Sequence, residues 1–244
     1  MSPVHEPASV LIPDQFMDRF LEEIFSCDRE FVSGYQYLHT DREFTRAANQ
    51  ILRMKNRKSS LRVHIECVSA TDANVIRGFI RHILPVTDSL GLNENELVLL
   101  MNHLPLSNLK VDDSGTLTPV KNIEAALALC KTVGLKRLHL HTFGYYILVI
   151  RGDVANALTS RNALLYASRE VANAAMGTEI EISEHGIRVI NAAAEAFQPG
   201  SSPGIFLAEP YVIVVVPTLI AKNVKKTVGL GDIISSTAFV ADVF

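Results

Sequence analysis

The chain has 244 residues, of which 48% are hydrophobic and 20% charged, so it can fill a sizeable core and is not disordered as a whole. Lys and Arg total 23 against 26 Asp and Glu, and the net charge of -3 argues against a general nucleic-acid-binding surface. The three separated cysteines form neither a disulfide framework nor a zinc motif, no apolar run is long enough to span a membrane, and residues 1–13 lack the pattern of a signal peptide. We therefore expect a cytoplasmic protein with no nucleic-acid or membrane partner.

Helical and strand-like periodicities alternate along the chain. Up to residue 102 they predict helices over 14–25, 41–54, 71–84 and 94–102, which alternate with strands over 30–34 and 62–68 and an extended segment over 87–92. A loop over 105–118 and a helix over 122–133 follow, and then two strands over 137–142 and 145–151. The remainder holds helices over 154–176 and 186–197, a loop over 198–204, a strand over 211–216 and a last helix over 232–243. This alternation predicts a layered α/β fold with a mostly parallel sheet, and no shift in composition marks a second domain.

A Gly-x-Gly-Asp turn at residues 229–232 leads directly into the last predicted helix. Two glycines let the backbone approach a ligand closely, and the free N–H groups at a helix start attract an anion. The residues alone fit two interpretations equally well. In one, the turn binds a phosphate with Asp232 as the neighbouring base; in the other, Asp232 is a plain helix N-cap.

Two acidic patterns precede this turn. His64 and Glu66 lie two residues apart on a predicted strand and therefore share one face. Taken alone, such a pair is more typical of polar residues at the edge of a sheet than of a functional site. Asn93 and Glu96 lie three residues apart where a helix begins, and this spacing is most typical of a capping box.

In combination and in this order, the H-x-E, N-x-x-E and G-x-G-D patterns resemble the motifs of the ADP-dependent glucokinase and phosphofructokinase family, a branch of the ribokinase-like superfamily. The segment from His141 to Tyr145 is similar to a fourth motif of that family, which lies near the adenine. The resemblance implies a ribokinase-like layered α/β/α fold that holds the large, nucleotide-binding domain, with the lid domain largely absent. Because family members are nearly twice as long, residues 1–244 would be the C-terminal portion of such a kinase domain.

The resemblance also implies a role for each motif. Asp232 would be the catalytic base and a metal-site residue, and the amides of Gly229, Leu230 and Gly231 would form the anion hole. Glu66, oriented by His64, and Glu96 would hold Mg²⁺ largely through water. The residues implied near the nucleotide are Asn93, His141, Thr142, Tyr145 as a stacking face, and Ala221.

The implied activity is the Mg²⁺-dependent transfer of a phosphoryl group from ADP to fructose 6-phosphate or glucose, giving AMP, as a glycolytic step. Most sugar contacts of the family lie in the half to which this chain does not correspond, so we expect a separate N-terminal half or self-association. Two alternatives stay open: a non-catalytic nucleotide-binding or assembly module of the same fold, and an ATP-dependent ribokinase-like kinase.

Overall fold

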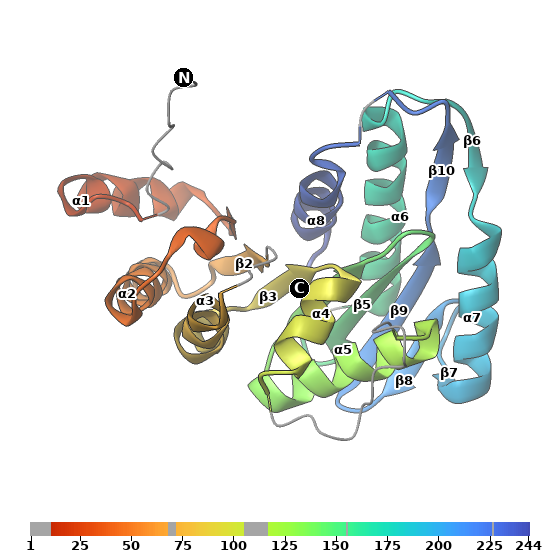
Figure 1. The fold of residues 1–244 in the computed structure, drawn as a ribbon, viewed down its shortest axis with the longest axis horizontal. Coiled ribbons are helices and arrows are strands. Elements are labelled where there is room, and N and C mark those ends of the chain that lie inside the picture. Colours follow the sequence, from red (N-terminus) through yellow and green to blue (C-terminus); the bar gives the residue numbers. More distant parts are fainter. Residues whose placement is uncertain (1–10, 68–71, 105–116, 155, 226) are drawn as a thin grey trace. The chain divides into compact units, whose positions relative to one another are not determined.

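The structure is a computed structural model that describes residues 11–67, 72–104, 117–154, 156–225 and 227–244 (Figure 1). The chain divides into two compact units, Met1–Thr87 and Asp88–Phe244. Most of the loop expected over 105–118 and the start of the helix expected over 71–84 lie outside the described residues. Among the helices of the described ranges, none combines the length and apolar character that crossing a lipid bilayer requires.

The first unit holds two parallel strands and three helices within its described residues. β1 (Arg29–Val32) pairs with β2 (Arg62–Glu66). The helices are α1 (Asp14–Glu23), α2 (Asp41–Arg57) and α3 (Ala73–Gly78), and α3 continues into a π-helical turn (Phe79–Ile83) and a 3₁₀ turn (Leu84–Val86). A Cβ at Gly78 would overlap the ring of Phe44, so the glycine lets α3 pack closely against α2.

The second unit is built on a sheet whose described strands follow the order β3-β4-β5-β9-β8-β7. Their bounds are β3 (Ser89–Leu92), β4 (Arg137–His141), β5 (Tyr145–Arg151), β9 (Tyr211–Pro217), β8 (Ile205–Ala208) and β7 (Gln198–Pro199). A separate antiparallel pair joins β6 (Thr178–Ile182) to β10 (Leu219–Lys222).

The expectation of a mostly parallel sheet is wrong for this unit. β3 and β4 are parallel, but β4 with β5, β5 with β9, β9 with β8 and β8 with β7 are all antiparallel. The reason at β4 and β5 is the short connection over residues 142–144, where Gly144 has a φ of +107°. A connection of this length can only form a hairpin, because a parallel pair needs a much longer crossover.

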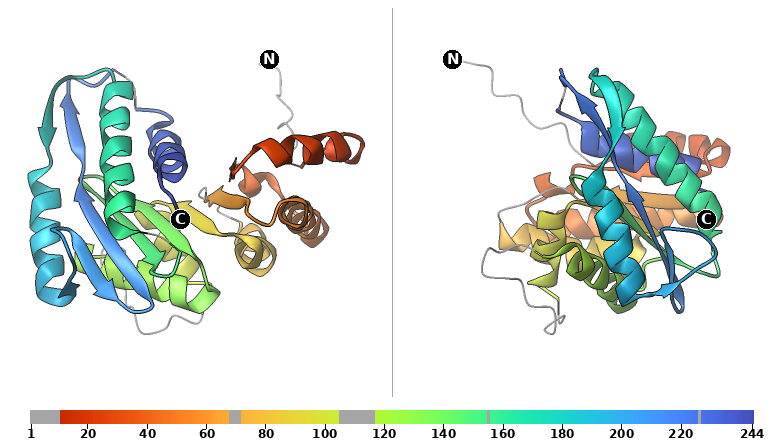
Figure 2. Two further views of the ribbon diagram at one scale, coloured as in Figure 1. Left: turned by 180° about the vertical axis from the view of Figure 1, so that it is seen from behind. Right: turned by 90° about the vertical axis from the view of Figure 1, so that its right-hand side faces the viewer.

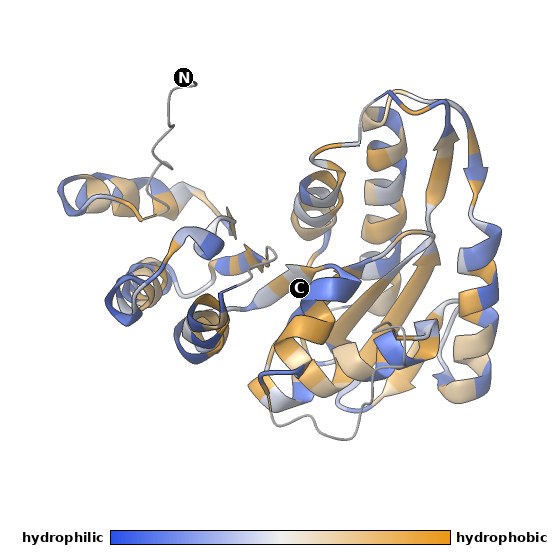
Figure 3. Cartoon of the chain, viewed as in Figure 1, coloured by the Kyte–Doolittle hydropathy of each residue, from blue (hydrophilic) through white to orange (hydrophobic). Residues whose placement is uncertain are grey.

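Helices cover both faces of this sheet, as the layered α/β/α expectation requires (Figures 1 and 2). α6 (Ala157–Ala174) and α8 (Leu230–Ala241) pack together on one face, and α5 (Pro119–Val133) and α7 (Glu184–Ala196) on the other, with α4 (Glu94–Met101) beside α5. Apolar residues are concentrated on β5 and β9 (Figure 3). The core between the sheet and the helices α6 and α8 includes Tyr146, Leu148, Ile150, Leu164, Ala167, Val171, Val214, Val216, Ile234 and Ala238.

Candidate functional site

One edge of the second unit's sheet collects the ends of its central strands. β3 and β4 are parallel and in register, so Asn93 and His141, at their carboxyl ends, leave the sheet at the same edge. β5 begins and β9 ends there too, because Tyr145 pairs with Pro217. In α/β proteins, ligands bind at the carboxyl ends of the parallel strands, so a binding site is expected at this edge.

α8 begins with the glycine turn. Gly229 is the N-cap residue with a φ of +78°, and no side chain among the described residues caps this helix end. Within the part of the chain that the structure describes, no atom lies within 4 Å of the position that a Cβ at Gly229 would occupy, so these residues leave the turn open to a ligand. Asp232 is exposed in the first turn of α8, and its backbone oxygen accepts a 2.6 Å hydrogen bond from the Ser236 hydroxyl. The turn therefore presents amide N–H groups and a carboxylate side by side.

A cavity of about 310 Å³ lies against this turn. Its walls come from the β4–β5 hairpin, β5, α6, β10 with a residue on either side of it, and the start of α8. The lining residues are His141, Thr142, Phe143, Gly144, Tyr146, Val171, Ala172, Ala175, Thr218, Leu219, Ile220, Ala221, Val224, Leu230, Gly231 and Ile234. The structure thus brings together His141, Thr142, Ala221, Leu230 and Gly231 of the sequence-predicted residues.

The cavity is mainly apolar with a few polar groups at one side. Aliphatic side chains of α6, β10 and α8 form most of its wall, whereas His141, Thr142 and Thr218 supply polar atoms. The His141 ring lies beside the glycine turn, since a Cβ at Gly231 would be 3.4 Å from its Cε1 atom. An apolar slot that opens beside free helix amides suits a flat heterocycle linked to an anionic group.

Two adjacent tyrosines face opposite sides of the sheet. Tyr145 points toward α5 and α7: Asn122 Nδ2 donates to its hydroxyl at 2.9 Å, and its ring meets that of His185 edge-on at 5.6 Å. Tyr146 points toward α6 and α8 and lines the cavity. Burial raises the pKa of both hydroxyls, that of Tyr146 to about 12. Tyr145, the predicted stacking face, is not among the cavity-lining residues.

The second acidic pattern forms the capping box that its spacing favours. Asn93 Oδ1 accepts the backbone N–H groups of Asn95 at 2.9 Å and Glu96 at 3.0 Å, and Glu96 Oε2 accepts the N–H of Asn93 at 2.9 Å. This box begins α4 at the sheet edge described above. Glu96 is buried, so its carboxylate is fixed in place by the helix cap.

The first acidic pattern belongs to the first unit, at the end of β2. His64 Nε2 lies 3.3 Å from Glu66 Oε2, and both side chains are buried. The His64 ring also stacks on Phe31, with centroids 5.0 Å apart and planes inclined by 16°. Within the described residues, no three His, Cys, Asp or Glu side chains gather closely enough to hold a metal ion on their own.

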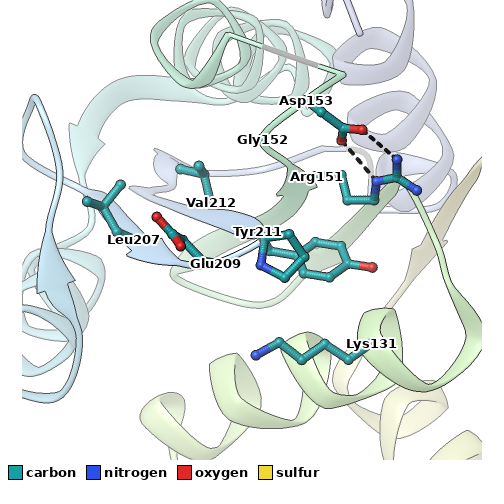
Figure 4. Close-up of a pocket in the computed structure, with 9 residues that line it drawn as sticks. Lys131, Arg151, Gly152, Asp153, Leu207, Glu209, Tyr211 and Val212 are labelled. Carbon is teal, nitrogen blue, oxygen red and sulfur yellow. Dashed lines mark hydrogen bonds and ion pairs between the residues drawn. The ribbon is translucent and has the colours of Figure 1, made fainter.

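Another cavity, of about 1070 Å³, lies at the opposite ends of β5 and β9, near the paired residues Arg151 and Tyr211 (Figure 4). It contains none of the sequence-predicted residues. Arg151 and Asp153 form a two-point ion pair at 2.9 and 2.5 Å, whose hydrogen bonds lower the pKa of Asp153. The Tyr211 hydroxyl donates to backbone oxygens of Cys130 and Leu135. Arg151, Asp153 and Tyr211 thus have hydrogen-bond partners within the protein, while Lys131 and Glu209 also line this cavity.

Sequence reasoning missed several residues of the 310 Å³ cavity. Phe143 lines it although 86% of the residue is exposed, and Tyr146 forms part of its wall. The small residues of α6 that line it carry no motif, because Ala and Val on a helix face are typical of any packed interior. Alternation along β5 was the available signal for Tyr146, since one of two adjacent strand residues must face α6 and α8.

Known proteins with related sequences are sugar kinases that use ADP. The family model for the "ADP-specific Phosphofructokinase/Glucokinase conserved region" matches residues 6–241. The ADP-dependent glucose/glucosamine kinase of Pyrococcus furiosus is 32% identical over 96% of this chain and 53% of its own length. The ADP-specific phosphofructokinase of Thermococcus litoralis is 26% identical over 87% of this chain and 49% of its own length.

Solved structures show the same fold. An ADP-dependent kinase in complex with fructose-6-phosphate and ADPbetaS superposes with a TM-score of 0.84 at 24% identity, covering 95% of this chain and 57% of that chain. A phosphofructokinase from Pyrococcus horikoshii with AMP gives 0.82 at 22% identity, covering 95% and 54%. These matches confirm the expected ribokinase-like fold, and the chain spans about half the length of the curated relatives it matches. With the family model matching nearly its whole length, the chain belongs to the ADP-specific phosphofructokinase/glucokinase family.

Proposed function

We propose that this chain is the nucleotide-binding and base-carrying, C-terminal portion of an ADP-dependent sugar kinase. It would transfer the terminal phosphoryl group of ADP to a hydroxyl of fructose 6-phosphate or glucose and release AMP. The observation that carries the proposal is the 310 Å³ cavity, which joins the β4–β5 hairpin to the glycine turn of α8. Membership of the family supports the choice of ADP and of a sugar acceptor.

The cavity suggests how ADP would lie. The adenine would enter the apolar slot between α6 and β10, near His141, Thr142 and Ala221. The phosphates would then extend toward the amides of Gly229, Leu230 and Gly231, where free N–H groups and the helix dipole stabilise negative charge. Asn93 lies at the same sheet edge and is the candidate for a further contact to the phosphates.

Asp232 would act as the general base. Phosphoryl transfer depends mostly on positioning and on stabilising charge, together with a base that takes the proton of the attacking hydroxyl. Asp232 is exposed in the first turn of α8, next to the proposed anion hole, so an acceptor hydroxyl can approach its carboxylate. As the oxygen of the sugar hydroxyl bonds to the terminal phosphorus of ADP and AMP leaves, the proton of that hydroxyl would pass to the Asp232 carboxylate.

Magnesium fits the donor chemistry of the predicted residues. Glu66, Glu96 and Asp232 offer carboxylate oxygens, and Mg²⁺ usually binds one or two carboxylates while keeping several waters. When bound, the ion would offset the charge of the transferring phosphoryl group. Glu96 Oε2 already accepts the Asn93 N–H, which holds this carboxylate in one orientation.

The test combines each phosphoryl donor with each sugar acceptor. Release of AMP or ADP is measured with ADP or ATP as the donor, and with fructose 6-phosphate, glucose or no sugar as the acceptor. The assay uses the chain alone and the chain mixed with the part of the Pyrococcus furiosus relative that lies outside the match. Sugar-dependent AMP formation from ADP supports the proposal. ADP binding without transfer in either format would favour a non-catalytic nucleotide-binding module, and preference for ATP would contradict ADP dependence.

A further inference from the structure

A polar face of β4 contacts α8 along the whole length of the helix. Arg137, His139 and His141 alternate along the strand and therefore share one face. Arg137 Nε donates to Asp242 Oδ2 at 3.0 Å, just beyond the last turn of α8, and the His141 ring lies against Gly231 in the first turn. β4 and α8 thus run in opposite directions, joined at both ends by side chains of this face.

His139 makes the contact between these two ends. Its Nδ1 atom lies 3.4 Å from the hydroxyl oxygen of Ser235, and both side chains are fully buried. Its ring also meets the rings of His141 and Tyr146 edge-on, with centroids 5.9 Å away in each case. His139 does not line the 310 Å³ cavity, but it touches two residues that do.

We propose that His139 is a positioning residue that sets the glycine turn of α8 against the nucleotide cavity. This inference rests on the proposed function, because the turn is taken to bind the terminal phosphate of ADP. His139 acts through Ser235 on the first turns of α8, and through His141 on Gly231. Amide groups stabilise a developing charge only when they are held in place before the reaction, so a small shift of α8 would weaken the site.

The contact pattern predicts a selective effect on nucleotide binding. ADP carries the terminal phosphoryl group that would reach the amides of the turn, whereas AMP lacks it. A displaced turn should therefore weaken ADP while leaving AMP, held by the cavity walls, nearly unchanged. A residue that merely supports the fold would weaken both nucleotides alike or neither.

The experiment measures the dissociation constants of ADP and AMP by calorimetry for the wild-type chain and four variants. His139→Ala removes the imidazole, His139→Asn keeps a polar atom near the position of Nδ1, and Ser235→Ala removes the partner hydroxyl with almost no change in volume. Tyr211→Phe is the matched control, because it removes buried hydrogen bonds to Cys130 and Leu135 at the far end of the same unit.

We expect His139→Ala to weaken ADP by about tenfold, equivalent to about 1.4 kcal/mol, with AMP changed by less than a factor of two. Ser235→Ala should weaken ADP in the same selective way, and His139→Asn should restore much of the loss. The control should leave the ratio of the two constants unchanged. Equal weakening of both nucleotides, or wild-type binding in the His139 and Ser235 variants, would overturn the inference. If His139→Ala does not fold, Ser235→Ala decides the question. Wild-type protein that binds neither nucleotide would refute the proposed function itself.

Discussion

Arg137 and Asp242 form an ion pair at 3.0 Å in which both side chains are completely buried. Ser160 donates to the second carboxylate oxygen of Asp242 at 2.6 Å, and Arg137 Nη1 donates to the Ser89 hydroxyl at 3.1 Å. The pair ties the C-terminal end of α8 to β4, whereas Asp232 lies in the first turn of the same helix. The Arg137–Asp242 ion pair therefore anchors the helix that carries the proposed base.

Arg137→Met should destabilise the second unit severely. Removing one partner of a buried ion pair leaves an uncompensated charge, at a cost of about 3 to 5 kcal/mol in the free energy of unfolding. Urea denaturation followed by circular dichroism measures this loss. The double variant Arg137→Met with Asp242→Leu should recover most of it, because neither charge is then buried alone. A single variant that loses less than about 1 kcal/mol, as exposed ion pairs do, would show that the pair does not anchor α8.

The two glycines of the turn should respond differently to alanine. Gly229 has a φ of +78°, so Gly229→Ala forces a side chain into the left-handed region and costs about 1 to 2 kcal/mol of stability. Gly231 has no such constraint, and its Cβ would make an ordinary 3.4 Å contact with His141. Gly231→Ala should therefore keep the stability of the chain but weaken ADP, because the methyl group crowds the amides.

Thermal unfolding and ADP titration of the two glycine variants separate these effects. AMP serves as the control ligand, because its contacts would lie away from the turn. Unchanged ADP affinity in Gly231→Ala would argue that no phosphate approaches this turn.

Glu66→Gln and Glu96→Gln should each raise the Mg²⁺ concentration needed for half-maximal phosphoryl transfer. Both replacements keep the side-chain length, and a glutamine at 96 can still accept the Asn93 N–H through its amide oxygen. Only the negative charge is lost, so the affinity for Mg²⁺ should fall more than the stability of the fold. Glu43→Gln is the matched control, since Glu43 forms a capping box with Thr40 at the start of α2. If all three variants show the wild-type metal dependence, the capping and strand-edge interpretations are sufficient.

Tyr146 makes stability depend on pH in alkaline solution. Burial raises its pKa to about 12 in the folded chain, whereas an unfolded tyrosine loses its proton near pH 10. Between these values the folded state holds more protons than the unfolded state, so the free energy of unfolding should fall as pH rises. Tyr146→Phe removes this contribution while keeping the ring. Urea denaturation at several pH values compares the two proteins, and identical slopes would show that the hydroxyl is accessible to water.

Much of the fold follows from local patterns. β5 has the bounds that its apolar run predicts, and α5 ends at Gly134, whose φ of +72° is the conformation of a glycine helix cap. β6 was not predicted, although Ile180 and Ile182 alternate with Glu179 and Glu181, and all five of its residues are exposed. The antiparallel pairing of β4 and β5 was also missed, although the strands predicted over 137–142 and 145–151 follow each other with a connection too short for a parallel crossover.

The candidate site was predictable where its chemistry resides in short motifs. The glycine turn and His141 stand next to each other in the structure, although 90 residues separate them in the sequence. Tyr146 and His139 were not among the predicted site residues. The choice between Tyr145 and Tyr146 depends on which face of the sheet α6 covers, and the importance of His139 depends on α8 packing over β4.

The central claim is that Asp232 serves as the base in phosphoryl transfer from ADP, and its most direct test is the sugar-dependent rate of AMP formation in wild type and Asp232→Asn. The assay contains Mg²⁺ and ADP, both sugars in turn, and the unmatched part of the Pyrococcus furiosus relative. Asp153→Asn is the control, because this exposed carboxylate lies at the far end of β5. We predict at least about a hundredfold loss of turnover in Asp232→Asn, the lower range for a general base, with ADP affinity retained and the control unaffected. AMP formation at the wild-type rate in Asp232→Asn would contradict the account.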